Sequence, residues 1–446
     1  MGLYSRLLML CLGTLTAFGL APDFQGSSLH EFSNSEAVAI PSDQVSVRTS
    51  TILVSGAGNF LLDVDVVTTI QHTFCADLDI TIQSPRGTIV TLTTDNGGAA
   101  DDVFNGTLWD DSANPSGTAP YVSNPGLVTD HPFANDVTAE SLVPEEALAA
   151  FIGENPNGIW KLTVSDDTAS DGGMLSGWSV LVTTVEKRIA LPEAVVTENT
   201  NALAIPIGPD TVTSDLLVDG AGAFLFDVNV QTTVSHPFPQ DLDITLTSPS
   251  GTVVTLTTDN GNGHADVFNG TLWDDDADPR SELPYVTNDG LATDRAYTPR
   301  EVATALVPEE ALGAFVGENP NGRWILSIHD DTAPDGGLLT AWSLSIVAKS
   351  PTLRVVRPLF GENIAAGSRI KVKWKNEGNV GPRVAIQLWR HGALVSTLRA
   401  SANNDGHQFV RIPVNTPAGG GYRIRVRSES GDTSALGARF SVRSGF

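Results

Sequence analysis

The sequence predicts an all-β protein made of two tandem β-sandwiches and a smaller, immunoglobulin-like β-sandwich. Three observations lead to this prediction. A long segment occurs twice at an offset of 164 residues, so that Trp109 corresponds to Trp273 and Trp160 to Trp324. Short segments of alternating apolar and polar residues are separated by Gly, Pro, Asn and Asp, as in antiparallel sheets. The charge balance also changes after Lys349, which indicates a third domain.

The first 21 residues have the pattern of a secretory signal peptide. Arg6 precedes an apolar stretch at 7–15, and small residues follow as far as Ala21. This segment is too short to span a membrane, and no later stretch reaches the roughly 18 apolar residues that a span needs. We therefore expect a secreted protein, extracellular or at the cell surface. Residues 22–45 are predicted to be a flexible leader.

The repeated unit is predicted to fold once over 46–187 and again over 210–348, with residues 188–209 as a linker. In the first copy, strands are expected over 60–67, 77–83, 88–93, 160–165 and 178–183, because apolar and polar residues alternate there. The segment Ala37-Val-Ala-Ile-Pro41 returns in the linker as Ala202-Leu-Ala-Ile-Pro206, so the approach segment belongs to the duplicated unit. Residues 144–151 are predicted to form about two turns of helix.

The order of motifs resembles one known domain family. The first copy contains Asp77-Leu-Asp-Ile-Thr-Ile-Gln-Ser-Pro-Arg-Gly-Thr88, then Asn157-Gly-Ile-Trp160, and then Asp171-Gly-Gly-Met-Leu175 followed by Trp178-Ser-Val. This pattern resembles the P domain, also called Homo B domain, of kexin- and furin-like proprotein convertases. The resemblance covers most of 46–187 and 210–348. It implies a jelly-roll sandwich that accompanies and stabilises a subtilisin-like protease domain.

The chain departs from that family because it carries no recognisable catalytic domain. The motifs of subtilisin-like proteases are absent, as are Gly-x-Ser-x-Gly and His-Glu-x-x-His, which mark other hydrolases. The segment between the signal peptide and the first copy is also far shorter than a protease domain. We therefore predict that this protein is not an enzyme.

Residues 351–446 are basic, whereas the rest of the chain is acidic. They hold 15 Lys and Arg against 5 Asp and Glu, while the whole protein has a net charge of −26. Segments such as 368–374, 384–389 and 422–427 alternate with period two, which predicts a small immunoglobulin-like sandwich. This part is similar to the Ser/Thr-rich module of fungal cell-wall glucan-assembly proteins, which implies a cell-surface context. Arg423, Arg425 and Arg427 should share one strand face.

Clustered carboxylates are the main candidates for a functional site. Calcium takes six to eight oxygen ligands, which Asp side chains and loop carbonyls supply, so we predict Ca²⁺ in loops of both copies. The alternative is that these residues cap turns and face solvent. The candidate ligands in the first copy are Asp95, Asp110, Asp111, Asp166, Asp167 and Asp171, and in the second copy Asp259, Asp274, Asp275, Asp330, Asp331 and Asp335.

Other repeated polar and aromatic residues are expected to be structural. Asp77 and Asp241, each at the start of a strand, should make a buried or turn-bracing hydrogen bond. His72 and His236 have no second His or Cys at metal-binding spacing. The repeated tryptophans are expected in the cores, with sugar stacking as the alternative. Cys11 lies in the signal peptide, which leaves Cys75 without an intrachain disulfide partner.

These observations favour a non-catalytic, multidomain binding or structural protein outside the cell. Its partner would be an extracellular protein or an anionic cell-surface polymer, because arginine binds carboxylate, sulfate and phosphate groups. An alternative is an accessory protein that binds or stabilises a separate subtilisin-like protease. A metal-dependent hydrolase that uses the Asp clusters is a third, weaker hypothesis, because no His base accompanies them. Nucleic acid is disfavoured as a partner, because the chain is predicted to be exported and carries a net negative charge.

Overall fold

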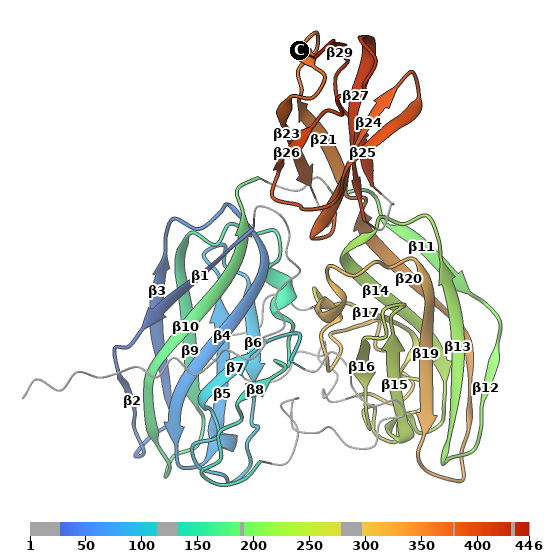
Figure 1. The fold of residues 1–446 in the computed structure, drawn as a ribbon. Helices are drawn as coiled ribbons and strands as arrows, with labels where there is room; N and C mark the ends of the chain where they lie inside the picture. The colour runs from blue at the N-terminus through green and yellow to red at the C-terminus, as the bar shows by residue number, and fades with distance from the viewer. Residues whose placement is uncertain are drawn as a thin grey trace, which may run out of the picture.

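A computed structural model gives the structure of the protein and describes residues 27–113, 133–187, 191–277, 297–377, 380–429 and 433–445. Three β-sandwiches follow one another along the chain, and the predicted all-β fold is confirmed (Figure 1). The two repeated sandwiches stand beside one another, and the C-terminal sandwich lies at one end of the pair (Figure 1). The predicted signal peptide, residues 1–21, lies outside the described residues.

The first sandwich packs two sheets around one apolar core. One sheet has the order β1-β10-β4-β7-β8, with β2 also paired to β10, and the other has the order β3-β9-β5-β6. The strands are β1 (Ser28–Asn34), β2 (Val38–Ile40), β3 (Ser46–Val54), β4 (Phe60–His72), β5 (Leu78–Gln83), β6 (Ile89–Thr93), β7 (Asn105–Trp109), β8 (Ser141–Leu142), β9 (Gly158–Asp166) and β10 (Gly173–Val185), with short 3₁₀ helices η1 (Cys75–Asp77) and η2 (Leu148–Phe151). The alternating side chains of the long strands β4 and β10 supply the core from one side.

The second sandwich repeats this topology strand for strand. Its sheets have the orders β11-β20-β14-β17-β18, with β12 on β20, and β13-β19-β15-β16. Its elements are β11 (Val195–Asn199), β12 (Leu203–Ile205), β13 (Asp210–Val218), β14 (Phe224–Ser235), η3 (Pro239–Asp241), β15 (Leu242–Thr247), β16 (Val253–Thr257), β17 (Asn269–Trp273), β18 (Ala305–Leu306), η4 (Leu312–Phe315), β19 (Gly322–Asp330) and β20 (Gly337–Lys349).

The C-terminal sandwich is smaller and is built from the basic part of the chain. A three-stranded sheet, β21-β23-β26, lies opposite a sheet with the order β22-β29-β27-β24-β25, to which β28 adds on β27. The strands are β21 (Thr352–Arg357), β22 (Asn363–Ala365), β23 (Arg369–Glu377), β24 (Arg383–Arg390), β25 (Ala393–Asn403), β26 (His407–Arg411), β27 (Gly419–Ser428), β28 (Ser434–Leu436) and β29 (Phe440–Arg443).

The repeated tryptophans lie in the cores, as the sequence predicts. Trp109 and Trp160 are fully buried, and each indole N–H donates a hydrogen bond, to Thr68 Oγ1 at 2.9 Å and to the Pro156 carbonyl at 2.8 Å respectively. Phe151 packs edge-on against Trp160. These pairs recur in the second sandwich. Buried aromatic rings whose polar atoms are satisfied stabilise a sandwich core, so these residues hold the fold and leave no exposed stacking face.

The leader and the linker both contain strands, which corrects the expectation of flexible segments. β1 and β2, from the predicted leader at 22–45, pair along β10, and β11 and β12, from the predicted linker at 188–209, pair along β20. Asn34 also reaches across to Ser50 Oγ at 3.0 Å, as Asn199 reaches Ser214. These strands cover a sheet edge that would otherwise leave backbone groups unpaired.

The predicted two-turn helix at 144–151 is wrong for its first half. Only Leu148–Phe151 is helical, and it is a single 3₁₀ turn. Glu145 and Glu146 instead donate their backbone N–H groups to carbonyls of β6, and their carboxylates accept the N–H groups of Thr94 and Thr91. Backbone and side-chain hydrogen bonds therefore tie these two residues to β6 and its end in a bend, outside any helix.

The two repeated sandwiches touch through a small apolar cluster of their own. Phe60, Leu62 and Val185 of the first sandwich pack against the Phe224–Phe226 segment and Val347 of the second. Phe224 and Phe226 are almost fully buried, and their rings lie 4.9 Å apart. Burial of apolar surface stabilises such contacts, so the tandem copies form a joined pair.

Candidate functional site

Six aspartates converge at one end of the first sandwich, and we call them the first end cluster. The 3₁₀ turn η1, the start of β5, the loop after β6 and the loop between β9 and β10 bring them together. The cluster consists of Asp77, Asp79, Asp95, Asp166, Asp167 and Asp171. The Asp167 N–H donates to the Asp77 carbonyl at 3.1 Å, which fixes the β9–β10 loop against η1.

A buried histidine braces this end of the sandwich. The His72 ring contacts the Phe74 carbonyl through Nδ1 at 2.8 Å and Asp166 Oδ2 through Nε2 at 3.5 Å. In the second copy the His236 ring lies 3.0 Å from Asp330 Oδ2. Both rings are buried. Each histidine therefore orients the aspartate that ends the central strand of its sheet, which agrees with the structural role that the sequence predicts.

Two buried carboxylate oxygens of the first end cluster have no hydrogen-bond donor. They are Asp77 Oδ2 and Asp166 Oδ1, from residues that are 7% and 1% exposed. The sequence predicts a buried or turn-bracing hydrogen bond for the Asp77 side chain, but only its backbone makes one. A buried anionic oxygen without a partner carries a large desolvation cost. This cost makes the first end cluster a candidate for binding a cation.

The raised pKa values in the first end cluster agree with carboxylates that lack a compensating positive charge. Burial, followed by the charges of Asp95 and Asp167, raises the pKa of Asp79 to about 8. Burial and then the Asp166 and Asp171 charges raise the pKa of Asp77. Like charges and desolvation both favour the protonated carboxyl. At neutral pH Asp79 therefore keeps a proton that an isolated aspartate would release.

The second end cluster repeats the first, but neither Asp241 nor Asp330 has a buried oxygen without a donor. Its members are Asp241, Asp243, Asp259, Asp330, Asp331 and Asp335. Burial, followed by the charges of Asp259 and Asp331, raises the pKa of Asp243 to about 8. Here, however, Asp330 Oδ1 accepts the Thr332 N–H at 3.2 Å. The strand-end aspartate of the second copy is thus better satisfied than that of the first.

The remaining predicted ligands lie elsewhere, at the contact between the two sandwiches. Asp111 accepts the Leu148 and Ala149 N–H groups at 2.9 and 2.7 Å, and Asp275 accepts those of Leu312 and Gly313 at the same distances. These carboxylates cap the 3₁₀ turns η2 and η4. Their neighbours brace loops too, because Asp110 accepts the N–H and hydroxyl of Ser112, and Asp274 accepts the Asn229 amide. This geometry favours the turn-capping alternative for these four residues.

The turn-capping aspartates face one another across the contact. A Cβ placed on Gly313 would lie 3.3 Å from Asp111 Oδ2, 3.4 Å from Asp275 Oδ2 and 3.2 Å from the Ala149 Cβ. Burial raises the pKa of Asp111 to about 7, and burial followed by the Asp111 charge raises that of Asp275. Glycine at 313 therefore allows η2 and η4 to approach closely.

Within the residues that the structure describes, no group of three or more His, Cys, Asp or Glu side chains is arranged to hold a metal ion. The end clusters thus offer anionic oxygens from several elements but not a closed ligand shell. In the same part of the chain, no helix has the length and the apolar character needed to span a membrane.

Sequence reasoning missed Asp79 and Asp243 as members of the end clusters. Each occupies a polar position in a strand of alternating apolar and polar residues, where an exposed side chain is expected. Both are instead buried, because the outer side of β5 and β15 is covered as well. The signal that could have identified them is their identity at the repeat offset of 164.

One comparison, with protein-family models, agrees with the repeated architecture. Residues 61–182 and 225–282 match the family model of the proprotein convertase P-domain. No curated protein matches the chain. Among solved structures, a serine protease of Aeromonas sobria is 18% identical, covering 36% of this chain and 28% of its own, with a TM-score of 0.22. Fibronectin(III)-like modules of Clostridium thermocellum CbhA are 14% identical, covering 20% of this chain and 94% of their own, with a TM-score of 0.15.

Proposed function

We propose that this chain, whose two repeated sandwiches are P domains, is a secreted, non-catalytic binding protein of the extracellular space or cell surface. The two P domains would form an acidic pair that calcium stabilises. The basic C-terminal sandwich would engage an anionic partner. The P domain itself is a non-catalytic domain, and the proposal assigns binding rather than turnover to the whole chain.

The observation that carries this proposal is the apolar contact between the two P domains. An apolar P-domain face is available to a protease domain only if nothing else covers it. Here Phe60, Leu62 and Val185 of the first P domain are covered by Phe224 and Phe226 of the second. This face is therefore occupied by the tandem neighbour, which supports a self-contained pair.

The end clusters support the calcium part of the proposal. Asp77 Oδ2 and Asp166 Oδ1 are buried without a donor, and carboxylate oxygens are the ligands that Ca²⁺ prefers. Asp77 and Asp166 would both have to be ligands of the calcium ion, and Asp171 and loop carbonyls would complete its coordination shell. Calcium would supply charge neutralisation and would tie η1 to the β9–β10 loop.

Thermal unfolding in calcium and in chelator tests this assignment. A ligand that binds only the native state raises the unfolding midpoint by mass action. We expect calcium to raise the midpoint of the wild-type protein. The double variant Asp77→Asn, Asp166→Asn should lose that rise, and in chelator it should be no less stable than wild type, because a buried charge has been removed.

A matched control is Glu198→Gln, which neutralises an exposed carboxylate on β11. It should keep the full response to calcium. An unchanged wild-type midpoint, or an equal loss of response in the control, would refute calcium binding at the end clusters and leave their carboxylates as proton-binding structural groups.

A second candidate function is favoured by the family match. P domains accompany subtilisin-like proteases, so this chain could bind and stabilise a separate protease. Co-purification of the intact protein with secreted subtilisin-like proteases, followed by unfolding of the protease with and without it, distinguishes the two functions. A raised midpoint of the protease supports the accessory role, and no association supports the self-contained binding protein.

A further inference from the structure

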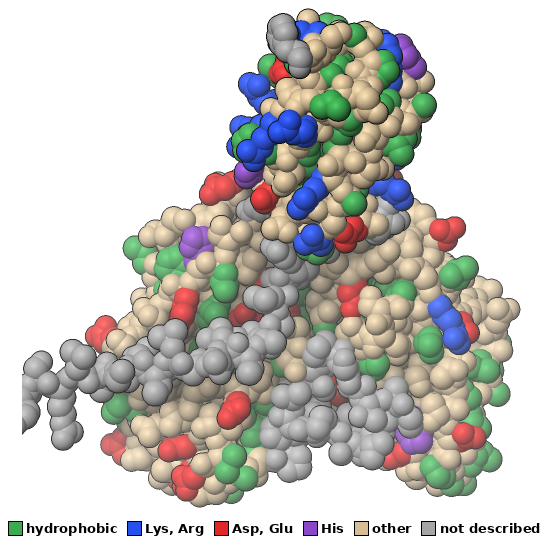
Figure 2. Space-filling view, in the orientation of Figure 1, with side chains coloured by type: hydrophobic (Ala, Val, Ile, Leu, Met, Phe, Trp, Pro, Cys, Tyr) green, Lys and Arg blue, Asp and Glu red, His purple; other side chains and the backbone are tan. Residues whose placement is uncertain are grey.

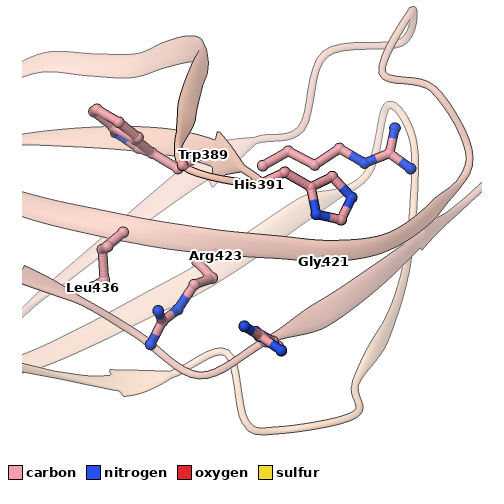
Figure 3. A pocket seen from close by; sticks show the side chains of 8 residues that line it. Trp389, His391, Gly421, Arg423 and Leu436 are labelled. Carbon is pink, nitrogen blue, oxygen red and sulfur yellow. The ribbon is translucent and has the colours of Figure 1, made fainter.

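A pocket of about 230 Å³ opens at one end of the C-terminal sandwich, where β24 turns into β25 beside the start of β27 (Figure 3). Its walls combine an indole, an imidazole and three guanidinium groups. The lining residues include Trp389, Arg390, His391, Arg423, Leu436 and Arg439. Among the residues that the structure describes, no carboxylate lines it. Figure 2 shows Lys and Arg side chains gathered on this sandwich, whereas Asp and Glu predominate over the P domains.

Two of the pocket arginines are held in place through the backbone. Arg390 Nε donates to the Gly420 carbonyl at 3.2 Å, and Arg423 Nε donates to the Gly437 carbonyl at 2.7 Å. Among the described residues, no acidic side chain forms an ion pair with Arg390, Arg423 or Arg439. The terminal nitrogens of these anchored side chains therefore keep donors for an external anion, in the planar arrangement that suits carboxylate and sulfate.

Glycines make room for these side chains. A Cβ on Gly419 would lie only 2.4 Å from the Arg390 Nη2, and a Cβ on Gly421 would lie 2.7 Å from the His391 ring. Gly421 also has a φ of +85°, which other residues rarely adopt. The Gly419-Gly-Gly421 segment thus lets β27 begin directly beneath Arg390 and His391.

The pocket also has a firm apolar side. Arg425 stacks over the Trp389 ring at 5.0 Å, and the indole N–H donates to Gln387 Oε1 at 3.0 Å, so the ring is held in one orientation. Leu436, which is 43% exposed, adds an aliphatic surface. Arg425 covers one face of this ring, so the apolar surface beside the fixed cations consists of the rest of the indole and Leu436, which suits the C–H groups of a sugar ring that also carries a negative group.

A row of cations continues from the pocket along β27. Arg423, Arg425 and Arg427 alternate with the buried Tyr422, Ile424 and Val426, so they share one face, as the sequence predicts. Residues two apart on a strand are roughly 7 Å apart. A row of regularly spaced cations suits a polymer whose charge repeats, and the pocket is smaller than the sites that enclose whole small molecules, which start at about 300 Å³.

We propose that this pocket and the adjoining row bind an acidic polysaccharide, with one uronate or sulfated sugar seated against Trp389 and its anionic group on Arg390 and Arg423. This inference rests on the proposed extracellular function and deepens it by naming the ligand class. Carboxylate and sulfate share the chemistry that guanidinium recognises. An acidic peptide would use the arginines but would not need the Trp389 and Leu436 surface.

Calorimetric titration of the intact protein tests the proposal. The probes are an oligogalacturonate, a sulfated dextran oligosaccharide, an uncharged dextran oligosaccharide of equal length and poly-glutamate. We expect at least one anionic oligosaccharide to bind, more weakly as salt rises, and the uncharged one not to bind. The first two probes distinguish a carboxylate ligand from a sulfate ligand.

Matched variants locate the binding. Arg390→Gln with Arg423→Gln should weaken binding by about tenfold or more, because two charge-assisted hydrogen-bonding groups are lost. Lys371→Gln with Lys373→Gln removes the same charge from exposed positions on β23 and should change affinity by less than about twofold. If the first double variant does not fold, Arg439→Gln, whose side chain has no hydrogen bond within the described residues, takes its place.

Three outcomes would overturn the proposal: no binding of either anionic oligosaccharide, equal weakening by the two double variants, or binding of poly-glutamate as tight as that of the sugars. None of these depends on calcium, because the pocket and the end clusters lie in different sandwiches. If calcium does not raise the unfolding midpoint but the protein still binds the sugar, only the calcium assignment is refuted.

Discussion

At the scale of single residues, the buried aspartates of the end clusters determine how the protein responds to pH. Burial and neighbouring carboxylates raise the pKa of both Asp79 and Asp243 to about 8. In the unfolded chain these groups have pKa values near 3.8. The native state therefore binds more protons than the unfolded state over the interval between these values.

The sign of the effect follows from this difference. A carboxyl whose pKa is higher in the folded state stabilises the fold most below pH 4, and this contribution is lost as pH rises to about 8. We expect the free energy of unfolding, measured in chelator with denaturant, to fall by a few kcal/mol between about pH 5 and pH 8. Asp79→Asn with Asp243→Asn should make this decline shallower without abolishing it, because burial also raises the pKa of Asp65 to about 9 and that of Asp63 and Asp111 to about 7. Glu198→Gln should leave the decline unchanged. Stability that rises with pH over this interval would contradict the assignment.

Residue-level prediction from the sequence succeeded where local pattern and burial coincide. The tryptophans and His72 lie in the interior because they belong to strands whose alternation is clear. Asp95, Asp166, Asp167 and Asp171 do gather at one end. Asp110 and Asp111 could not be separated from them by sequence, because a carboxylate that caps a turn and one that faces a cation have the same one-dimensional signature.

At the scale of secondary-structure elements, the contact between η2 and η4 determines how closely the repeated sandwiches approach. The two turns differ at one position, where the first copy has Ala149 and the second has Gly313. The space beside Gly313 is bounded by Ala149 and by the carboxylates of Asp111 and Asp275. A side chain there must displace the opposite turn or another neighbour.

We expect Gly313→Val to loosen the contact between the two repeated sandwiches without unfolding either one. Overpacking of a tight contact costs about 1–3 kcal/mol. Small-angle scattering should show a larger radius of gyration, while circular dichroism stays unchanged. Ala149→Gly, which removes a methyl group from the same contact, is the control and should leave the radius unchanged. A variant as compact as wild type would show that this contact does not set the spacing.

The elements most poorly predicted were those whose partners are distant in sequence. β1 and β2 were assigned to a flexible leader because they are polar and short, yet they pair with β10, which lies more than a hundred residues later. Likewise, the segment before η2 contains residues that favour helix, but its backbone hydrogen bonds go to β6. Tertiary pairing overrode local propensity in both cases.

At the scale of the whole molecule, the duplication could be predicted from sequence but the way the copies join could not. The repeat offset identifies equivalent positions, but it does not say which of them meet. The apolar cluster at the contact contains two equivalent pairs, Phe60 with Phe224 and Leu62 with Phe226, together with Val185 and Val347, whose counterparts are Lys349 and Thr183. The contact is therefore built partly from equivalent and partly from non-equivalent positions. The charge asymmetry between the acidic pair and the basic end was evident from composition alone.

One difference between the two copies provides a chemical probe of local opening. Cys75, which the second copy replaces with Pro239, is the only cysteine among the described residues and is completely buried. Burial raises the pKa of its thiol to about 11. Because the thiolate is the reactive form, alkylation in a folded chain must wait for the first sandwich to open. The labelling rate of protein lacking residues 1–21 would thus report the opening of the first sandwich, while the second sandwich, which has no cysteine among its described residues, would not react.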